Sequence, residues 1–279
     1  MDYKYKLRSG SKKNLCPSCQ KKTFKPYVCN KTNVEVGEKY GICDRINSCG
    51  YKLYPKFDKN DDWRPTPKPY VAPKPIEYVS KELVEATLNL YQSNVFVMYL
   101  VKTFGNVVAF ELIEKYNIGT CKGGGTVFWQ QDLKGNFRTG KAMYYHENGR
   151  RNKEKLSWFV HKKIREDFNF QQCFFGLHLC DGSKPVALCE SEKTAVLMSV
   201  YQPEFTWVAS GGSEMLNIQR LGELPRLDKV FADGGFFERW QNKTRHFENR
   251  KMDLSVEKAI ADGLIPDGSD ILDLIQLNL

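Results

Sequence analysis

The sequence predicts an α/β protein preceded by a small metal-binding segment, and two patterns indicate this. From residue 184 onward, short apolar runs alternate with stretches of helical periodicity, as in a parallel sheet joined by helical crossovers. Five of the nine cysteines fall within residues 16–49, and five prolines between positions 65 and 75 set that segment apart. With 41% hydrophobic and 27% charged residues, the composition excludes global disorder.

The N-terminal cysteines follow the spacing C-x2-C-x23-C-x5-C, formed by Cys16, Cys19, Cys43 and Cys49. Zn²⁺ takes four thiolates at tetrahedral corners, and two short turns that each carry two thiolates supply them without a large core. A Cys-Pro-x-Cys turn followed by a pair ending in Cys-Gly-Tyr is typical of a zinc ribbon, although x5 is longer than the common x2. Cys29 is the rival fourth ligand. Four thiolates close the coordination shell, so the zinc is expected to be structural.

Positive charge is concentrated at the N-terminal end of the sequence. Residues 1–75 contain 17 Lys or Arg and 7 Asp or Glu, a net charge of +10, whereas the remaining 204 residues carry 25 and 26. Such a segment favours a polyanionic partner, nucleic acid first, and a solvated lysine-rich terminus is the alternative. Aromatic residues alternate with the cations, which suits single-stranded nucleic acid or, alternatively, a small ribbon core. The candidate contacts here are Lys21, Lys22, Lys25, Arg45 and Lys52.

The chain is expected to have four parts. These are a zinc ribbon over residues 1–54, a proline-rich linker over 55–79, a mixed helix and strand region over 80–180, and a parallel-sheet domain over 181–279. The prolines favour an extended linker and exclude a helix there. The middle region predicts helices over 80–91, 94–105 and 107–117, then a hairpin with strands 126–132 and 137–145. Arg138 and Lys141 on this hairpin either contact nucleic acid or belong to an ordinary half-buried hairpin.

Acidic residues follow the predicted strands of the C-terminal domain. The strands are 184–190, 205–210, 227–232 and a short one around Met252, and Glu190 and Asp233 stand at the ends of the first and third. Carboxyl ends of parallel strands form the ligand-binding edge of such sheets. With Asp270 and Asp273 from the chain end, these carboxylates make a hard oxygen site suited to Mg²⁺.

The alternative is that these acids stabilise helix N-termini, because a negative charge is favourable there. Ser191 and Glu192 fit that helix-capping role entirely. Function is favoured for Glu190 and Asp233.

Residues 184–274 resemble the Toprim domain of bacterial-type primases, topoisomerases and some nucleases. The matching features are Glu190 in ALCESEKTA, the Gly211-Gly212 pair, Asp233 in VFADGG and the acidic tail GSDILDLI. The N-terminal ribbon is similar to the zinc-binding domain that precedes Toprim in those primases. The order of the parts over most of the chain therefore resembles primase-like, zinc-ribbon Toprim proteins of mobile genetic elements.

The resemblance implies metal-assisted nucleotidyl transfer on single-stranded DNA in replication or mobilisation. Mg²⁺ or Mn²⁺ would be held by Asp233 with Asp270 or Asp273, Glu190 would act as general acid/base or as a further ligand, and Lys193 would contact phosphate. A replicative helicase or a mobilisation protein is the implied protein partner.

One departure from the Toprim pattern keeps other functions open. Toprim domains usually have Asp-x-Asp at the third strand, whereas this chain has Asp233-Gly234-Gly235. Glu238 is one helical turn further and either substitutes for the missing acid or is an ordinary solvated residue. The alternatives are a non-catalytic DNA-binding protein with a degenerate Toprim domain and a Toprim nuclease.

We expect a cytoplasmic protein. No segment reads as a membrane span, and the N-terminus lacks the apolar core of a secretory signal. An odd cysteine count argues against a disulfide framework.

Overall fold

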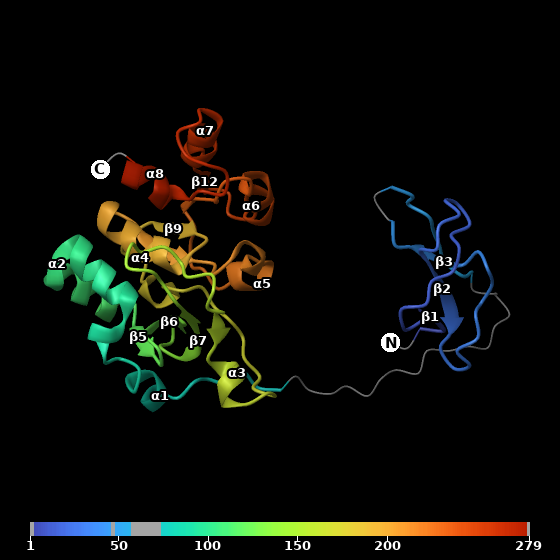
Figure 1. Cartoon of the computed structure of the whole chain (residues 1–279), viewed down its shortest axis with the longest axis horizontal. Coiled ribbons are helices and arrows are strands. Elements are labelled where there is room, and N and C mark those ends of the chain that lie inside the picture. Colours follow the sequence, from blue (N-terminus) through green and yellow to red (C-terminus); the bar gives the residue numbers. More distant parts are fainter. Residues whose placement is uncertain (1–2, 46–47, 57–73, 278–279) are drawn as a thin grey trace. The chain divides into compact units, whose positions relative to one another are not determined.

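The computed structural model describes residues 3–45, 48–56 and 74–277. The chain divides into two compact units, Met1–Pro73 and Lys74–Leu279 (Figure 1). Residues 57–73, which make up most of the expected proline-rich linker, lie outside the described residues.

The first unit is an antiparallel sheet with the strand order β1-β2-β3-β4. Burial alternates along β2, so one face of the sheet is covered and the other is partly open. The covered side holds a small core of Phe24, Cys16 and Cys43, and the ring of Tyr51 meets Phe24 edge to face. The strands are β1 (Tyr5–Leu7), β2 (Phe24–Cys29), β3 (Gly41–Cys43) and β4 (Lys52–Leu53).

The second unit begins with helices and an antiparallel sheet of order β5-β6-β7-β8, so the predicted mixed region is confirmed. The predicted hairpin is the centre of this sheet. Its turn is held by the Asp132 carboxylate, which accepts the backbone N–H groups of Lys134 and Asn136 at 3.0 and 2.9 Å. The elements are α1 (Lys81–Glu85), η1 (Tyr91–Ser93), α2 (Val95–Lys115), β5 (Ile118–Cys121), β6 (Gly125–Gln131), β7 (Phe137–Met143), β8 (Trp158–Phe159), α3 (His161–Ile164) and η2 (Leu177–Leu179).

Two helices begin at the polar residues that the sequence indicates. The side chains of Ser80 and Asn94 each accept the backbone N–H three residues further on and so cap α1 and α2. α1 nevertheless ends at Glu85, and the prediction of a helix over 80–91 is wrong. The carbonyl of Thr87 accepts the N–H of Thr120 in β5 at 2.7 Å, so tertiary pairing replaces the next helical hydrogen bond.

α2 is a described helix that is long and apolar enough, by length and composition, to cross a membrane. This corrects the expectation that no segment is long and apolar enough to span a membrane. Gly105, at φ 79° and ψ 168°, interrupts the helix where the sequence predicts a stop. Each half therefore has about ten residues, and a single span needs about 20. Phe96, Leu100 and Leu112 of this helix are buried in the protein core.

The C-terminal half contains the predicted parallel sheet flanked by helices, with strand order β10-β9-β11-β12. β9 lies between β10 and β11, so the chain continues from β9 to one side of the sheet and then returns to the other side. The strand order therefore reverses at β9. Open parallel sheets bind ligands at the carboxyl ends of the strands next to such a reversal. The elements are β9 (Val186–Cys189), α4 (Glu192–Tyr201), β10 (Thr206–Ala209), η3 (Ser213–Met215), α5 (Ile218–Leu221), β11 (Lys229–Val230), α6 (Phe237–Lys243), β12 (Lys251–Met252), α7 (Ser255–Ala261) and α8 (Ile271–Leu277).

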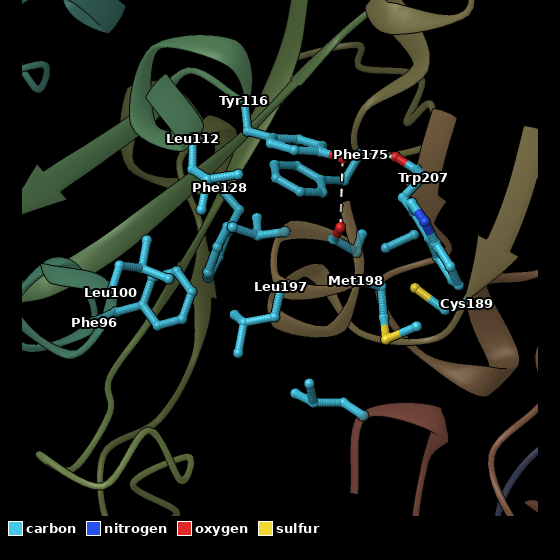
Figure 2. Close-up of a cluster of buried hydrophobic side chains, with 14 of the residues drawn as sticks. Phe96, Leu100, Leu112, Tyr116, Phe128, Phe175, Cys189, Leu197, Met198 and Trp207 are labelled. Atoms are coloured by element: carbon cyan, nitrogen blue, oxygen red, sulfur yellow. Dashed lines mark hydrogen bonds between the residues drawn. The ribbon is translucent and has the colours of Figure 1, made fainter. Parts of the chain in front are cut away.

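One hydrophobic core joins the two sheets of the second unit (Figure 2). Phe96 and Phe128 come from the antiparallel half, and Trp207 comes from the parallel half. Tyr116 stacks on Phe175 with 5.1 Å between ring centroids, and its hydroxyl donates to the Trp207 carbonyl at 3.3 Å. Side chains of either sheet are thus positioned against the other.

Candidate functional site

The first unit contains a four-cysteine metal centre. The Sγ atoms of Cys16, Cys19, Cys43 and Cys49 all lie within 4.8 Å of one another. The Cys16–Cys49 and Cys19–Cys43 sulfurs are 3.8 and 4.0 Å apart. Four sulfurs at about 2.3 Å from a tetrahedral zinc ion are about 3.8 Å apart, so the residues fit the ion. Cys29, at the end of β2, stands outside this set, and the closed shell makes the zinc structural.

Two carboxylates of the second unit stand at the carboxyl ends of neighbouring parallel strands. Glu190 follows β9 directly, and Asp233 follows β11 after two further residues. Burial raises the pKa of Asp233 to about 9, and the negative charges of Glu190, Asp270 and Asp273 add to the shift. The predicted acids are therefore within electrostatic reach of one another. We call Glu190, Asp233 and Asp270 the acid edge.

Glu190 presents an oxygen without a partner. Burial is the largest cause of its raised pKa, and the Ser213 N–H and the Lys141 charge oppose the shift. Its Oε2 is buried with no hydrogen-bond partner among the described residues. The backbone around it is fixed, because the Glu190 carbonyl accepts the Gly211 N–H at 2.8 Å. A buried polar atom without a partner is costly, which suits an oxygen that receives a cation or a proton.

Asp270 reaches the acid edge from the start of α8. Its Oδ1 accepts the Asp273 N–H at 3.0 Å, while Asp273 Oδ2 accepts the Asp270 N–H at 3.1 Å. The hydroxyl of Thr194 in α4 donates to Asp270 Oδ2. The Gly234 N–H donates to the Ser269 carbonyl at 2.9 Å and ties the loop after β11 to this segment. Burial raises the pKa of Asp270, and the Thr194 hydrogen bond opposes that shift.

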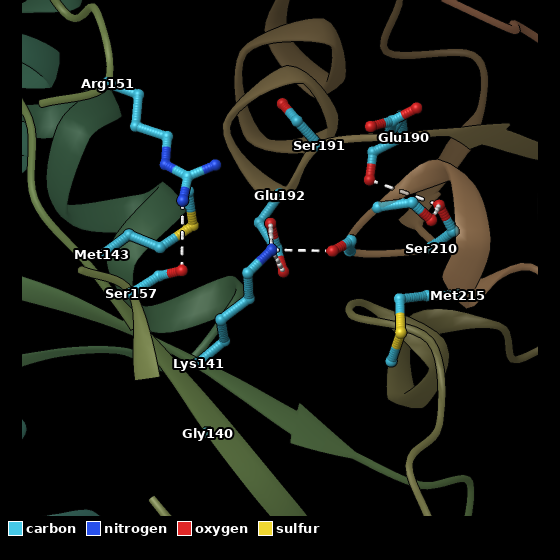
Figure 3. A network of polar contacts seen from close by, with 12 residues as sticks. Gly140, Lys141, Met143, Arg151, Ser157, Glu190, Ser191, Glu192, Ser210 and Met215 are labelled. Carbon is cyan, nitrogen blue, oxygen red and sulfur yellow. Dashed lines mark hydrogen bonds and ion pairs between the residues drawn. The ribbon is translucent and has the colours of Figure 1, made fainter. Parts of the chain in front are cut away.

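Lys141 and Glu192 form a buried ion pair beside the acid edge (Figure 3). Lys141 Nζ lies 3.1 Å from Glu192 Oε1 and Oε2, and it donates to the Gly211 carbonyl at 2.8 Å. The two side chains are only 11% and 1% exposed. Lys141 thus fixes the loop after β10, which is a different use from the expected nucleic-acid contact. The prediction that Glu192 only caps its helix is wrong, whereas Ser191 does cap α4.

The other predicted cations divide between internal and exposed positions. Arg138 Nε pairs with Asp132 at 2.7 Å, and its side chain is 11% exposed, so this cation also points inward. Lys193 is at the start of α4 and lines a surface cavity. In the first unit, Lys21, Lys22 and Lys52 are exposed, while Lys25 and Arg45 are partly buried.

Gly235, at the position where the Toprim pattern would have a second aspartate, has an unusual backbone. Gly235 has φ +83°, a left-handed conformation that strains residues other than glycine, and its N–H donates to Glu257 Oε1 at 3.0 Å. Glu238 lies exposed on α6 and is absent from the charges that shift Asp233. Glycine at 235 is therefore the residue that this loop conformation requires.

A cavity of about 710 Å³ lies next to Asp270: Ser269 and Asp273 line it, whereas the three acids of the edge do not. Asp273 and Lys193 line it together with the loop between β7 and β8, which contributes Arg150, Arg151 and Lys153. Sequence reasoning missed these three cations. The available signal was the basic run GRRNK in a polar turn, but its proximity to Asp273 depends on the tertiary fold and cannot be read from the local sequence.

The comparisons with known proteins give two family matches. Residues 94–231 match the model described as "Domain of unknown function (DUF6371)", and residues 3–62 match a zinc beta-ribbon finger model. The comparison with curated proteins gives no match.

Solved structures with a similar fold include three primases. The chain is 14% identical to the primase fragment of the bacteriophage T7 primase-helicase protein, with TM-score 0.38, covering 61% of this chain and 70% of that one. The DnaG primase catalytic domain bound to ssDNA is 16% identical, with TM-score 0.44 and coverage of 70% and 74%. The Aquifex aeolicus primase zinc-binding and RNA polymerase domains are 10% identical, with TM-score 0.39 and coverage of 98% and 79%.

Proposed function

We propose that the chain is a primase-like nucleotidyltransferase that uses Mg²⁺ or Mn²⁺ and acts on single-stranded DNA. The observation that carries this proposal is the acid edge. Glu190 follows β9, Asp233 follows β11 after two residues and Asp270 precedes α8, and burial raises the pKa of each. Buried carboxylates with raised pKa values at the ligand-binding edge of a parallel sheet are typical of functional sites.

The chemistry of the donors at this edge suits a divalent cation, although among the described residues only the four cysteines lie close enough together to form a group of three or more metal ligands. Carboxylate oxygens are the ligands that Mg²⁺ prefers, and one or two of them suffice because the ion keeps several waters. Asp233 and Asp270 would hold the ion, with Glu190 or Asp273 as a further ligand. When bound, the ion would neutralise charge on a transferring phosphoryl group.

The chain's own residues supply the remaining functions. Glu190 Oε2 has no partner among the described residues, and its raised pKa suits it to accept a proton from an attacking hydroxyl. Lys193, Arg150 and Arg151 line the adjoining cavity, where cations would bind the phosphates of a nucleotide. Lys141 holds the loop after β10 through the Gly211 carbonyl, which keeps the edge preorganised.

The ribbon supplies the polynucleotide contacts in this proposal. Its described residues include thirteen Lys or Arg against three Asp or Glu, a net charge of +10. Exposed Lys21, Lys22 and Lys52 are suited to phosphates of a single strand. A mobile-element role, with a replicative helicase or a mobilisation protein as partner, belongs to the same proposal.

A non-catalytic DNA-binding protein is the second candidate. The observation that favours it is Gly235, whose backbone conformation disfavours an aspartate at the position where Toprim domains usually have one. A nuclease would use the same acid edge, but it would hydrolyse a phosphodiester bond instead of forming one.

Nucleotide incorporation on single-stranded DNA tests the proposal. We expect the full chain with Mn²⁺ and labelled ribonucleotides to extend a primer or start one, and Glu190→Gln to lose this activity by at least about 100-fold, the range for general acid/base residues. Glu238→Gln, an exposed acid on α6, is the matched control and should keep it.

Two outcomes separate the candidates, and a third tests the role of Glu190. Strand cleavage instead of incorporation would identify the nuclease. If neither reaction occurs with any divalent cation while single-stranded DNA still binds, the enzyme proposal is refuted in favour of the binding protein. Equal activity in Glu190→Gln and the wild type would remove Glu190 from the chemistry.

A further inference from the structure

The open face of the ribbon sheet carries aromatic side chains. In the β1–β2 register, Tyr5 faces Cys29 and Leu7 faces Tyr27, so these side chains share one face. The opposite face of β2 presents Phe24 to the zinc-side core. Tyr27 therefore lies on the side of the sheet away from the metal centre.

Four tyrosines form a pocket on this first unit. A cavity of about 410 Å³ is lined by Tyr3, Tyr5, Tyr27 and Tyr54 together with Pro55. The rings of Tyr27 and Tyr54 are 5.9 Å apart between centroids and tilted by 40°. Tyr3 and Tyr54 are 69% and 55% exposed. Because these two rings bury so little of their surface, they contribute little to a core.

Cations surround the pocket and identify the class of ligand. Lys52 Nζ lies 5.0 Å from the Tyr54 ring centroid, and Lys4 Nζ lies 5.2 Å from that of Tyr5. A cationic ligand such as a methylated amine would be repelled by these ammonium groups and by the net charge of +10 on the described residues of the unit. A polyanion with flat aromatic groups fits both the charge and the rings, because single-strand binding surfaces combine cations for phosphates with aromatic platforms for bases.

We propose that the tyrosine pocket, formed by Tyr3, Tyr5, Tyr27, Tyr54 and Pro55, takes one unstacked base of single-stranded nucleic acid. The inference rests on the single-strand binding in the proposed function and adds the place where a base is held. Stacking on tyrosine is tolerant of base identity, so the pocket contributes affinity more than sequence choice.

An abasic strand separates base contacts from phosphate contacts. The probe is a fluorescein-labelled single-stranded DNA 12-mer, compared by anisotropy with a strand of equal length and charge whose bases are replaced by abasic sites. The full chain should bind the abasic strand at least about 5- to 150-fold more weakly, which corresponds to the loss of one stacked base. A set of strands, each with one 2-aminopurine at a different position, should show quenched 2-aminopurine fluorescence at the position where the base stacks.

Tyr54→Ala should reduce the affinity for the ordinary strand by the same roughly 5- to 150-fold and leave the slope of affinity against salt unchanged, because phosphate contacts remain. Tyr54→Phe keeps the ring and should restore binding. Leu53→Ala, an adjacent exposed residue that does not line the pocket, is the matched control. A zinc content of one ion per chain shows that each variant keeps its fold.

The results distinguish the pocket from the wider proposal. If the wild type binds ordinary and abasic strands equally, or if zinc-loaded Tyr54→Ala binds like the wild type, the pocket proposal is overturned while single-strand binding stands. If no single strand binds at all, the proposed function fails and the pocket proposal fails with it.

Discussion

Replacing Asp233 by asparagine tests the acid edge through its effect on stability. Asparagine keeps the shape of the side chain but cannot ionise. In the folded chain, burial and the neighbouring carboxylates raise the pKa of Asp233 from 3.8 to about 9. The folded protein therefore holds a proton at neutral pH that the unfolded chain releases. For a group whose folded pKa is raised, stability is fully present below the unfolded pKa and is lost as pH rises through the folded value.

The expected magnitude follows from one bound proton. Between about pH 4 and pH 9, the Asp233 contribution to the free energy of unfolding should fall by about 1.4 kcal/mol per pH unit. Asp233→Asn lacks this slope. From pH 7.0 to pH 8.5, the variant should therefore gain about 2 kcal/mol relative to the wild type. In a unit of about 200 residues, that corresponds to roughly 4–8 °C in Tm.

The assay is urea unfolding of both proteins at the two pH values, with magnesium left out rather than chelated. A chelator would also strip the zinc and unfold the ribbon. Adding 10 mM MgCl₂ should then stabilise the wild type, more at pH 8.5 than at pH 7.0, because binding displaces the proton of Asp233. The variant should gain little from magnesium and should lose nucleotide incorporation.

Two results would refute this reasoning. A difference in unfolding free energy between variant and wild type that is the same at both pH values would mean that Asp233 holds no extra proton in the folded chain. Equal stabilisation of both proteins by magnesium would mean that Asp233 is not a ligand.

Two further predictions concern the buried ion pair and the metal centre. Lys141→Met should cost about 3–5 kcal/mol in the free energy of unfolding because it leaves Glu192 buried and unpaired, and adding Glu192→Leu should recover most of that loss in a double-mutant cycle. The exposed Lys155→Met is its control, and a cost below about 1 kcal/mol for Lys141→Met would contradict the pairing. Cys16→Ser should lose zinc, measured as metal content, and leave the unfolding of the second unit unchanged, whereas Cys29→Ser should keep the ion. Zinc retained by Cys16→Ser and lost by Cys29→Ser would reverse the ligand assignment.

Local sequence signals predict much of the C-terminal half. Each expected strand there is present, and the parallel order follows from strands alternating with helices. Ser191 and Asn94 cap the helices that the sequence assigns to them, and Gly105 breaks α2 at the expected position. These features depend on residues within one turn of each other, which is the range over which sequence patterns are informative.

The missed features depend on long-range contacts. From its local sequence, Glu192 is predicted to stabilise the first turn of its helix. In the structure, its charge is paired with Lys141, which is 51 residues earlier in the chain. For the hairpin cations Arg138 and Lys141 the sequence leaves a nucleic-acid contact and an ordinary half-buried hairpin as alternatives, because alternation in a strand does not reveal whether the outer face is covered. Here the parallel half of the unit covers it, so both cations point into internal pairs.

The acid edge carries several negative charges and little compensating positive charge. Lys141 is close enough to lower the pKa of Glu190, yet its ammonium group is bound to Glu192 and the Gly211 carbonyl. It therefore offsets the charge of Glu190 only in part and is absent from the charges that shift Asp233 and Asp270, and the proton on Asp233 relieves part of the repulsion among the three acids. Asp270, held by the Thr194 hydroxyl and the Asp273 N–H, is a further negative charge at this edge. At neutral pH, a proton on Asp233 takes the place of a counter-charge, and a divalent cation would have to displace that proton. The cation would therefore bind more tightly as the pH rises.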